Sequence, residues 1–241
     1  MLSSIATPGT WLTPEEWQAV RLSLAVALRS VVFGLPPAIL VAVILSRGRF
    51  AGRGLLDAFV HLPLVMPPVV VGWLLLVTFG LRGPVGSLLN EWFGVRLVFT
   101  TGGAALATAV MSFPLIVRAV RLSLEAVDPQ LEAAARTLGA GPIDRFVTVT
   151  LPLMAPGILS GAITAFAAGL GEFGAVITFA SNIPGTTQTL PLAIYAATQT
   201  PGGEATAARL AAVSFVLAVA GLILADWAGR RMNRLLGRAA R

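Results

Sequence analysis

Very few side chains in this sequence could carry covalent or metal chemistry. All 17 basic residues are Arg, Cys is absent, and His61 is the single histidine. Disulfides and thiolate metal sites are therefore excluded. A hydrolase would need a nucleophile beside a base, yet only His61 could serve as an imidazole base and no Gly-x-Ser-x-Gly elbow occurs. The nucleotide-binding motif Gly-x-x-x-x-Gly-Lys-Ser/Thr is impossible without Lys, so we predict no catalytic residue, no metal and no cofactor bound by this chain.

Residues 128–142 instead have the pattern of a docking element. Asp128 can cap a helix N-terminus, Pro129 suits the first helical position, and Gly139 suits the left-handed position after a helix. These residues mark the two ends of a predicted helix of about ten residues. Its small apolar face is formed by Leu131, Ala134, Ala135 and Leu138. Glu132 and Arg136 have i, i+4 spacing and are expected to pair elsewhere on the helix. Such a helix could enter a groove on a soluble partner, whereas an ordinary interhelical loop would not need both caps and an apolar face.

The chain as a whole is too apolar for a water-soluble domain. Hydrophobic residues make up 56% of it, charged residues 12%, and its mean hydropathy is +0.84, whereas a soluble domain is about a quarter charged. The outer surface must therefore face lipid. About 20 apolar residues cross a bilayer as a helix, and five segments qualify: 17–46, 55–79, 103–124, 153–179 and 206–230. We predict an all-α integral membrane protein, a bundle of about five transmembrane helices in one domain over residues 1–241.

Two further local patterns bear on these elements. Thr13-Pro14-Glu15-Glu16 offers an N-cap, a proline at the first helical position and acidic residues at the positive end of the first helix. Residues 190–198 are apolar but too few to cross fully, so they are expected to form a half-helix or a re-entrant element.

The distribution of Arg indicates the orientation of the bundle. The connections after the first and third segments and the C-terminal tail are rich in Arg, whereas the N-terminus before Arg21 and residues 181–204 contain none. By the positive-inside rule, this predicts an N-terminus outside, a cytoplasmic C-terminus and a cytoplasmic segment 128–152. Because the Arg residues flank apolar runs, the net charge of +6 indicates membrane topology and predicts no nucleic-acid partner.

The cytoplasmic segment resembles the EAA loop of ABC-importer permeases. The positions at the family spacing are Ala134, Ala135, Gly139, Leu151 and Pro152. Glu132 falls one place before the usual Glu, where Ala133 stands, and Val149 replaces the usual Ile. The resemblance implies that this loop sits in a cleft of a cytoplasmic ATPase and transmits its closure to the membrane helices. The coupling residues it implies are Leu131, Glu132, Ala134, Ala135, Arg136, Leu138 and Gly139.

Other blocks narrow the resemblance to molybdate permeases of the molybdate and sulfate importer family. These blocks are residues 61–72, 111–115, 135–141, 170–175, 181–185 and 199–204. The Gly-Glu-Phe-Gly block at 171–174 is shared with sulfate permeases, so the molybdate assignment depends on all of the blocks together.

The resemblance implies a homodimer in the bacterial inner membrane, with the pathway between two copies. Two ATPase subunits carrying ATP and Mg would dock below, and a periplasmic binding protein would deliver molybdate or tungstate from outside. Sulfate or thiosulfate is the alternative substrate. An uncoupled channel or scaffold would explain the helices but not the capped cytoplasmic helix.

Two ionisable residues fall within the predicted spans, where charge is costly. Because a carboxylate would repel a dianion, Glu172 is expected to pair with Arg29 or to cap broken backbone near Gly171 and Gly174. Pathway or gate positions are expected at these two glycines, at Glu172, at Pro114, which removes a backbone hydrogen bond, and at uncharged donors. The donors are Ser112, Ser181, Asn182 and Thr187.

Overall fold

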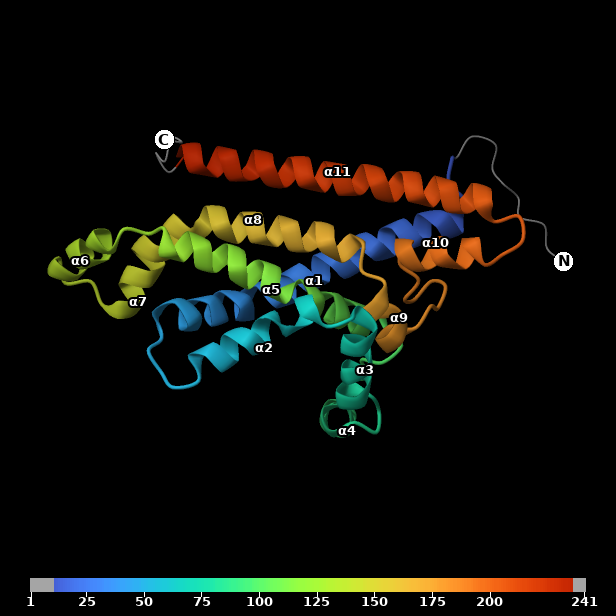
Figure 1. Ribbon diagram of the computed structural model, residues 1–241, viewed down its shortest axis with the longest axis horizontal. Helices are drawn as coiled ribbons and strands as arrows, with labels where there is room; N and C mark the ends of the chain where they lie inside the picture. The colour runs from blue at the N-terminus through green and yellow to red at the C-terminus, as the bar shows by residue number, and fades with distance from the viewer. Residues whose placement is uncertain (1–10, 236–241) are drawn as a thin grey trace. The chain divides into compact units, whose positions relative to one another are not determined.

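The computed structural model describes residues 11–235, and this part of the chain is helical with no β-strand (Figure 1). The prediction of an all-α protein is confirmed. The elements in chain order are α1 (Pro14–Arg47), α2 (Arg53–Val65), α3 (Pro68–Phe79), α4 (Pro84–Phe93), α5 (Thr101–Glu125), α6 (Pro129–Thr137), α7 (Pro142–Arg145), the π-helix η1 (Phe146–Thr150), α8 (Leu151–Leu170), α9 (Gly174–Ala180), α10 (Leu190–Thr198) and α11 (Glu204–Leu235).

Among the described residues, four helical stretches are long and apolar enough to cross a membrane. They are Pro14–Arg47, Thr101–Glu125, Pro142–Leu170 and Glu204–Arg231. A fifth span is present if α2 and α3 together count as one broken span. This number agrees with the predicted bundle of about five transmembrane helices.

Two of the five predicted segments are interrupted, one at Met66-Pro67 and the other at the break expected near Gly171 and Gly174. α2 ends at Val65, and Met66 is extended (ψ 143°) because Pro67 disfavours helical geometry in the residue before it. The fourth segment was predicted over 153–179, but its helix starts earlier and ends at Leu170, and α9 begins only at Gly174. By contrast, α1 and α5 remain helical through their internal prolines, and α10 has the predicted bounds 190–198.

The chain forms two compact units, and several of its helices contribute to both. The first comprises residues 11–29, 68–108 and 170–217, and the second comprises residues 30–67, 109–169 and 218–235.

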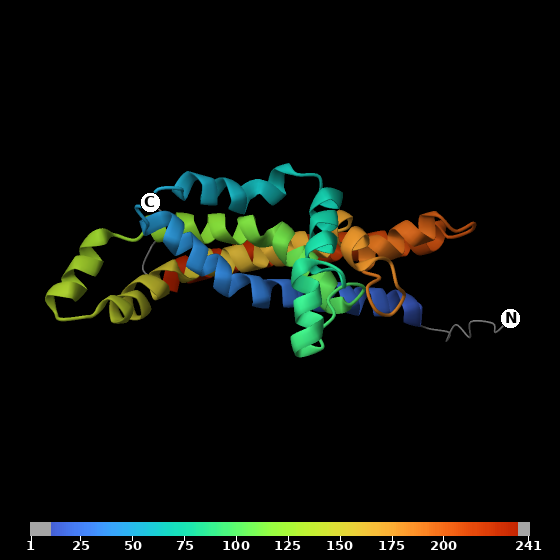
Figure 2. The same cartoon turned by 90° about the horizontal axis from the view of Figure 1, so that it is seen from below.

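In the second unit, α8 lies along α5 (Figures 1 and 2). Glycines allow the close approach, because a Cβ added at Gly157 would lie 2.2 Å from Cβ of Ser123, and one added at Gly161 would lie 3.0 Å from Cβ of Ala119. This is the small-residue packing that the Gly157/Gly161 spacing predicts. The buried core beside it includes Ala38, Ala42, Leu45, Val60, Ile116, Val117, Val120, Leu124, Met154 and Ala165.

In the first unit, α3 packs closely on α9. A Cβ added at Gly72 would lie 2.7 Å from the carbonyl oxygen of Ala175, so no larger residue fits there without a shift. α10 is tied to α1 because the backbone N–H of Leu190 donates to Oγ of Ser23 at 2.6 Å. A small core forms around this contact, made of Leu12, Ala19, Val20, Leu190, Ala193 and Leu210.

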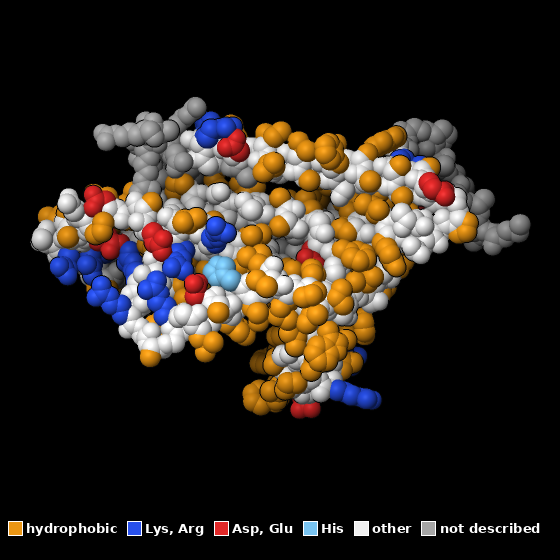
Figure 3. Space-filling model, viewed as in Figure 1, with side chains coloured by type: hydrophobic (Ala, Val, Ile, Leu, Met, Phe, Trp, Pro, Cys, Tyr) orange, Lys and Arg blue, Asp and Glu red, His pale blue; other side chains and the backbone are white. Residues whose placement is uncertain are grey.

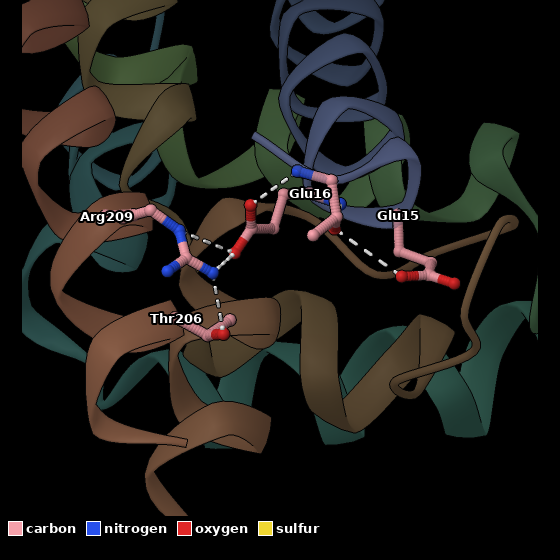
Figure 4. Close-up of polar contacts among 5 residues, drawn as sticks. Glu15, Glu16, Thr206 and Arg209 are labelled. Carbon is pink, nitrogen blue, oxygen red and sulfur yellow. Dashed lines mark hydrogen bonds and ion pairs between the residues drawn. The ribbon is translucent and has the colours of Figure 1, made fainter. Parts of the chain in front are cut away.

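The first unit also contains a polar contact between the starts of α1 and α11 (Figure 4). The N–H of Thr13 donates to Oε2 of Glu16 at 2.7 Å, and the N–H of Glu16 donates to Oγ1 of Thr13 at 3.3 Å. This is a capping box, so the predicted N-cap is confirmed. Oε1 of Glu16 accepts from Arg209, whose Nη2 lies at 2.5 Å and Nε at 3.2 Å. Since the side chain of Glu16 is only 4% exposed, its charge depends on Arg209.

Candidate functional site

The predicted docking helix is α6, and its ends are formed as the sequence indicated. Oδ1 of Asp128 accepts from the N–H of Gln130 at 2.9 Å, and Pro129 is the first helical residue. Gly139 follows the helix with φ of +89°, a left-handed conformation that glycine adopts without a Cβ penalty. Local sequence therefore fixes both ends of a nine-residue helix.

None of the residues of α6 is buried, and its apolar side chains face outward. Leu131 is 47% exposed and Leu138 is 88% exposed. Figure 3 shows basic side chains gathered at this end of the second unit, over α6 and α7. The helix thus presents an apolar surface with positive charges around it.

Glu132 does not make the predicted pair with Arg136. Its Oε1 accepts instead from the guanidinium of Arg47, at the end of α1, and from Oγ1 of Thr150 at 2.6 Å. Thr150 is the last residue of η1, directly before α8. The prediction was wrong because tertiary structure brings to the carboxylate two hydrogen-bond donors that are remote in sequence.

The electrostatics of this junction favour a charged Glu132. Partial burial acts to raise the pKa of its carboxyl, but hydrogen bonds from Thr150 and Arg47, with the charges of Arg47 and Arg145, outweigh it and lower the pKa below its ordinary value. Nε of Arg145 is buried and has no hydrogen-bond partner among the described residues. Glu132 therefore joins α6 to the ends of two long helices as an anion.

The predicted pathway residues lie in both units. In the first, Oε1 of Glu172 accepts from the N–H of Ala175 at 2.9 Å and so caps the start of α9. Of the two predicted alternatives, backbone capping is confirmed, while Arg29 and Glu172, both among the described residues, form no ion pair. Gly171 and Gly174 flank the same break, and Gly174 contacts α3, since a Cβ added there would lie 2.7 Å from Cβ of Pro68.

The connection between α9 and α10 contains three of the predicted uncharged donors. Oγ1 of Thr187 donates to the carbonyl oxygen of Ser181 and accepts from the N–H of Ile183, both at 2.9 Å. Ser181 has φ of +65°, which is rare for a residue other than glycine. Oδ1 of Asn182 is buried without a hydrogen-bond partner among the described residues. The two hydrogen bonds of Thr187 therefore stabilise the turn that contains Ser181 and Asn182.

Ser112 and Pro114 belong to the second unit and are buried within α5. Oγ of Ser112 donates to the carbonyl oxygen of Ala109 at 3.4 Å. Their role in a pathway remains a prediction.

Sequence reasoning missed the residues that hold α6 in place. Arg47 and Arg145 were counted only as topological signals, and Thr150 was given no role. It also missed a polar cleft of about 370 Å³ between α2 and α5 in the second unit. There, Arg121 lies 3.2 Å from Asp57 and 2.9 Å from Glu125.

Comparison with known proteins identifies the class of the chain. The profile of the family described as "Binding-protein-dependent transport system inner membrane component" matches residues 34–234. The chain belongs to this family. It is therefore a multi-pass permease component of the inner membrane, and the family is one that works with a binding protein and an ATPase.

Relatives of this permease cover almost the whole chain. The molybdenum transport system permease protein ModB of Escherichia coli (strain K12) is 56% identical over 94% of this chain and 99% of the relative. The protein of the same name from Haemophilus influenzae is 51% identical over 92% and 97%. The sulfate transport system permease protein CysT of Salmonella typhimurium is 36% identical over 91% of this chain and 80% of the relative.

Solved structures share the fold of this permease at low sequence identity. An amino acid ABC transporter crystallised with histidines matches with a TM-score of 0.65 and 19% identity, over 90% of this chain and 94% of that one. A bacterial alginate ABC transporter in complex with an alginate-pentasaccharide-bound periplasmic protein matches with a TM-score of 0.69 and 20% identity, over 95% and 82%. These neighbours have the fold of type I ABC-importer permeases, which agrees with the predicted helical bundle and with the resemblance to ABC-importer permeases.

Proposed function

We propose that this permease takes up molybdate or tungstate as the membrane subunit of an ATP-driven importer. The observation that carries the proposal is the 56% identity, over 94% of this chain, to a relative named for molybdenum transport. The relative named for sulfate transport is 36% identical. Sulfate or thiosulfate is thus the second candidate.

The proposed assembly contains two copies of this permease, a cytoplasmic ATPase dimer and a periplasmic molybdate-binding protein. The Arg distribution supports an N-terminus outside and a cytoplasmic C-terminus, which puts α6 on the side of the ATPase. ATP and Mg belong to the ATPase, since a chain without Lys cannot form the Walker A motif.

In this assembly α6 is the coupling helix. Its exposed Leu131 and Leu138 enter a groove of the ATPase, and closure of the ATPase displaces the helix. Because Glu132 is bonded to Arg47 and Thr150, the displacement reaches the ends of α1 and α8. ATP binding then shifts the population between two gate arrangements.

The proposed pathway uses uncharged groups to pass the oxyanion without trapping it. The candidates are Ser112, Ser181 and Asn182, with Thr187 supporting the turn that holds the last two. The break at Gly171 and Gly174, capped by Glu172, and the proline at Pro114 are the candidate gate positions.

The test is ATP-dependent uptake of labelled molybdate into vesicles that contain this permease, its ATPase and its binding protein. We expect excess tungstate to block uptake and excess sulfate to leave it unchanged. Uptake of sulfate instead would retain the importer and overturn the substrate. No ATP-dependent uptake of either anion by the assembled complex would overturn the proposal as a whole.

A further inference from the structure

A short helix between α3 and α5 has no role in the proposed transport cycle. α4 begins with Pro84 at its first position and ends at Phe93, and Gly94, which follows it, has φ of +65°. It is pressed against the end of α3 through glycines, since a Cβ added at Gly86 would lie 2.0 Å from the carbonyl oxygen of Gly80, and one added at Gly83 would lie 2.3 Å from that of Val77. A larger residue at either glycine would therefore push α4 away from α3.

The opposite face of α4 is an exposed apolar stripe. Leu88 is 51% exposed and Trp92 is 75% exposed, and they lie one helical turn apart. Leu81 before the helix and Val95 after it are apolar and exposed as well. Side chains of this size and number are not left in water without a partner.

The surroundings of the stripe indicate that lipid covers it. α3 exposes Val69, Trp73 and Val77, which are side chains of the kind that contact lipid in a membrane protein. Because α4 packs directly on α3, its stripe continues this apolar surface, as Figure 3 shows over α3 and α4. Trp is also the residue that gathers where a membrane meets water.

The charges beside the stripe fit the headgroup layer. Arg82 precedes α4 and Arg96 follows it, and both are exposed. Nε of Arg96 donates to Oδ1 of Asn90 at 3.0 Å, which holds the guanidinium beside the helix. Glu91 is the single acidic residue in this connection, so the net charge is positive and complements lipid phosphates.

We infer that α4 is an interfacial helix, lying in the headgroup region with Leu88 and Trp92 in the acyl boundary and with Arg82 and Arg96 at lipid phosphates. An amphipathic helix with Trp and Leu on its apolar face binds a membrane surface in this way. The contact would hold the end of α3 at a fixed depth. It depends on the membrane location of the chain and not on which anion it transports.

The absence of Cys from the sequence allows a direct test. Single cysteines are placed by Leu88→Cys and Trp92→Cys on the stripe, and by Ser87→Cys and Glu91→Cys as matched controls on the same helix. Each is spin-labelled in the full-length permease, assembled with its ATPase in vesicles containing phosphatidylglycerol. Collision with dissolved oxygen and with a water-soluble nickel complex then reports depth.

We expect labels at positions 88 and 92 to collide more often with oxygen, and labels at positions 87 and 91 to collide more often with the nickel complex. Equal nickel access at all four positions would overturn the inference. Strong spin–spin broadening between two copies would also overturn it, because it would assign the stripe to a dimer interface. So would low nickel access at positions 88 and 92 that appears only when the binding protein is present. The control variants keep Leu88 and Trp92, and a folding defect of a stripe variant is recognised because that variant fails to assemble with the ATPase.

Discussion

The bond between Glu132 and Arg47 offers the sharpest test of how α6 is held. Their side chains are 23% and 41% exposed, so the ion pair is worth about 0.5–1 kcal/mol. The hydrogen bond from Thr150 to the carboxylate adds about 1.5 kcal/mol or more. We therefore expect Glu132→Gln to destabilise the second unit by about 1–2 kcal/mol and Arg47→Gln by about 0.5–1 kcal/mol. The double variant should cost little more than Glu132→Gln alone, because both changes remove the same pair.

Two measurements on the reconstituted complex test whether Glu132 and Arg47 hold α6 together. One is thermal unfolding of the single and double variants, and the other is the ratio of anion uptake to ATP hydrolysed. A loss of about 1 kcal/mol at the junction changes the population of attached α6 roughly fivefold, so we expect the uptake ratio to fall by about two- to fivefold. Arg49→Gln is the matched control, since Arg49 is exposed in the same connection and forms no ion pair among the described residues.

The charge swap Arg47→Glu with Glu132→Arg should recover part of the uptake ratio that either change alone loses. The reasoning is refuted if the two neutral substitutions are additive within about 0.3 kcal/mol, or if uptake and hydrolysis stay coupled in both single variants.

Three further outcomes follow from the geometry. Because the pKa of Glu132 lies below its ordinary value, the contribution of this carboxylate to the free energy of unfolding is present at neutral pH and is lost as pH falls through the folded-state pKa. The stability difference between the native chain and Glu132→Gln should therefore shrink on acidification. Thermal unfolding of both proteins at pH about 7 and about 4 would show this. Gly157→Ala should cost about 1–3 kcal/mol because its Cβ has no space, whereas Gly229→Ala, with nothing within 4 Å, should not lower the unfolding temperature, because Ala is the better helix former. Arg209→Met should destabilise by about 2–4 kcal/mol, and more than Glu16→Gln, because it leaves a buried carboxylate unpaired; equal losses in denaturant unfolding would contradict this.

The helices that the sequence predicted well are those whose signals are local. Asp128, Pro129 and Gly139 act within a few residues of the backbone they shape, and each lies at its predicted position around α6. The bounds of α10 were also found, because residues 190–198 form a short apolar run. Hydrophobicity located the spans, whereas the break at residues 171–173 was indicated by the glycines Gly171 and Gly174.

What the sequence could not supply are contacts between distant residues. Arg47 and Glu132 are 85 positions apart, and no spacing rule connects them, whereas the i, i+4 rule suggested Arg136 as the partner. α4 was missed for a different reason. Its ten residues lie between spans and are too few to cross a membrane, although Gly83, Gly86 and the apolar positions Leu88 and Trp92 already had helical spacing.

The position of Thr150 has a mechanical consequence for the second unit. Thr150 ends a π-helical turn, a type of irregularity that occurs often at functional sites, and α8 starts at the next residue. A displacement of α6 that pulls on Glu132 must therefore act on the first turn of α8. α8 cannot slide freely, because Gly157 and Gly161 hold it in backbone-close contact with α5. On this geometry a displacement of α8 would also act on α5, which contains the buried Ser112 and Pro114, so α6 is linked to these pathway candidates through packing within one unit.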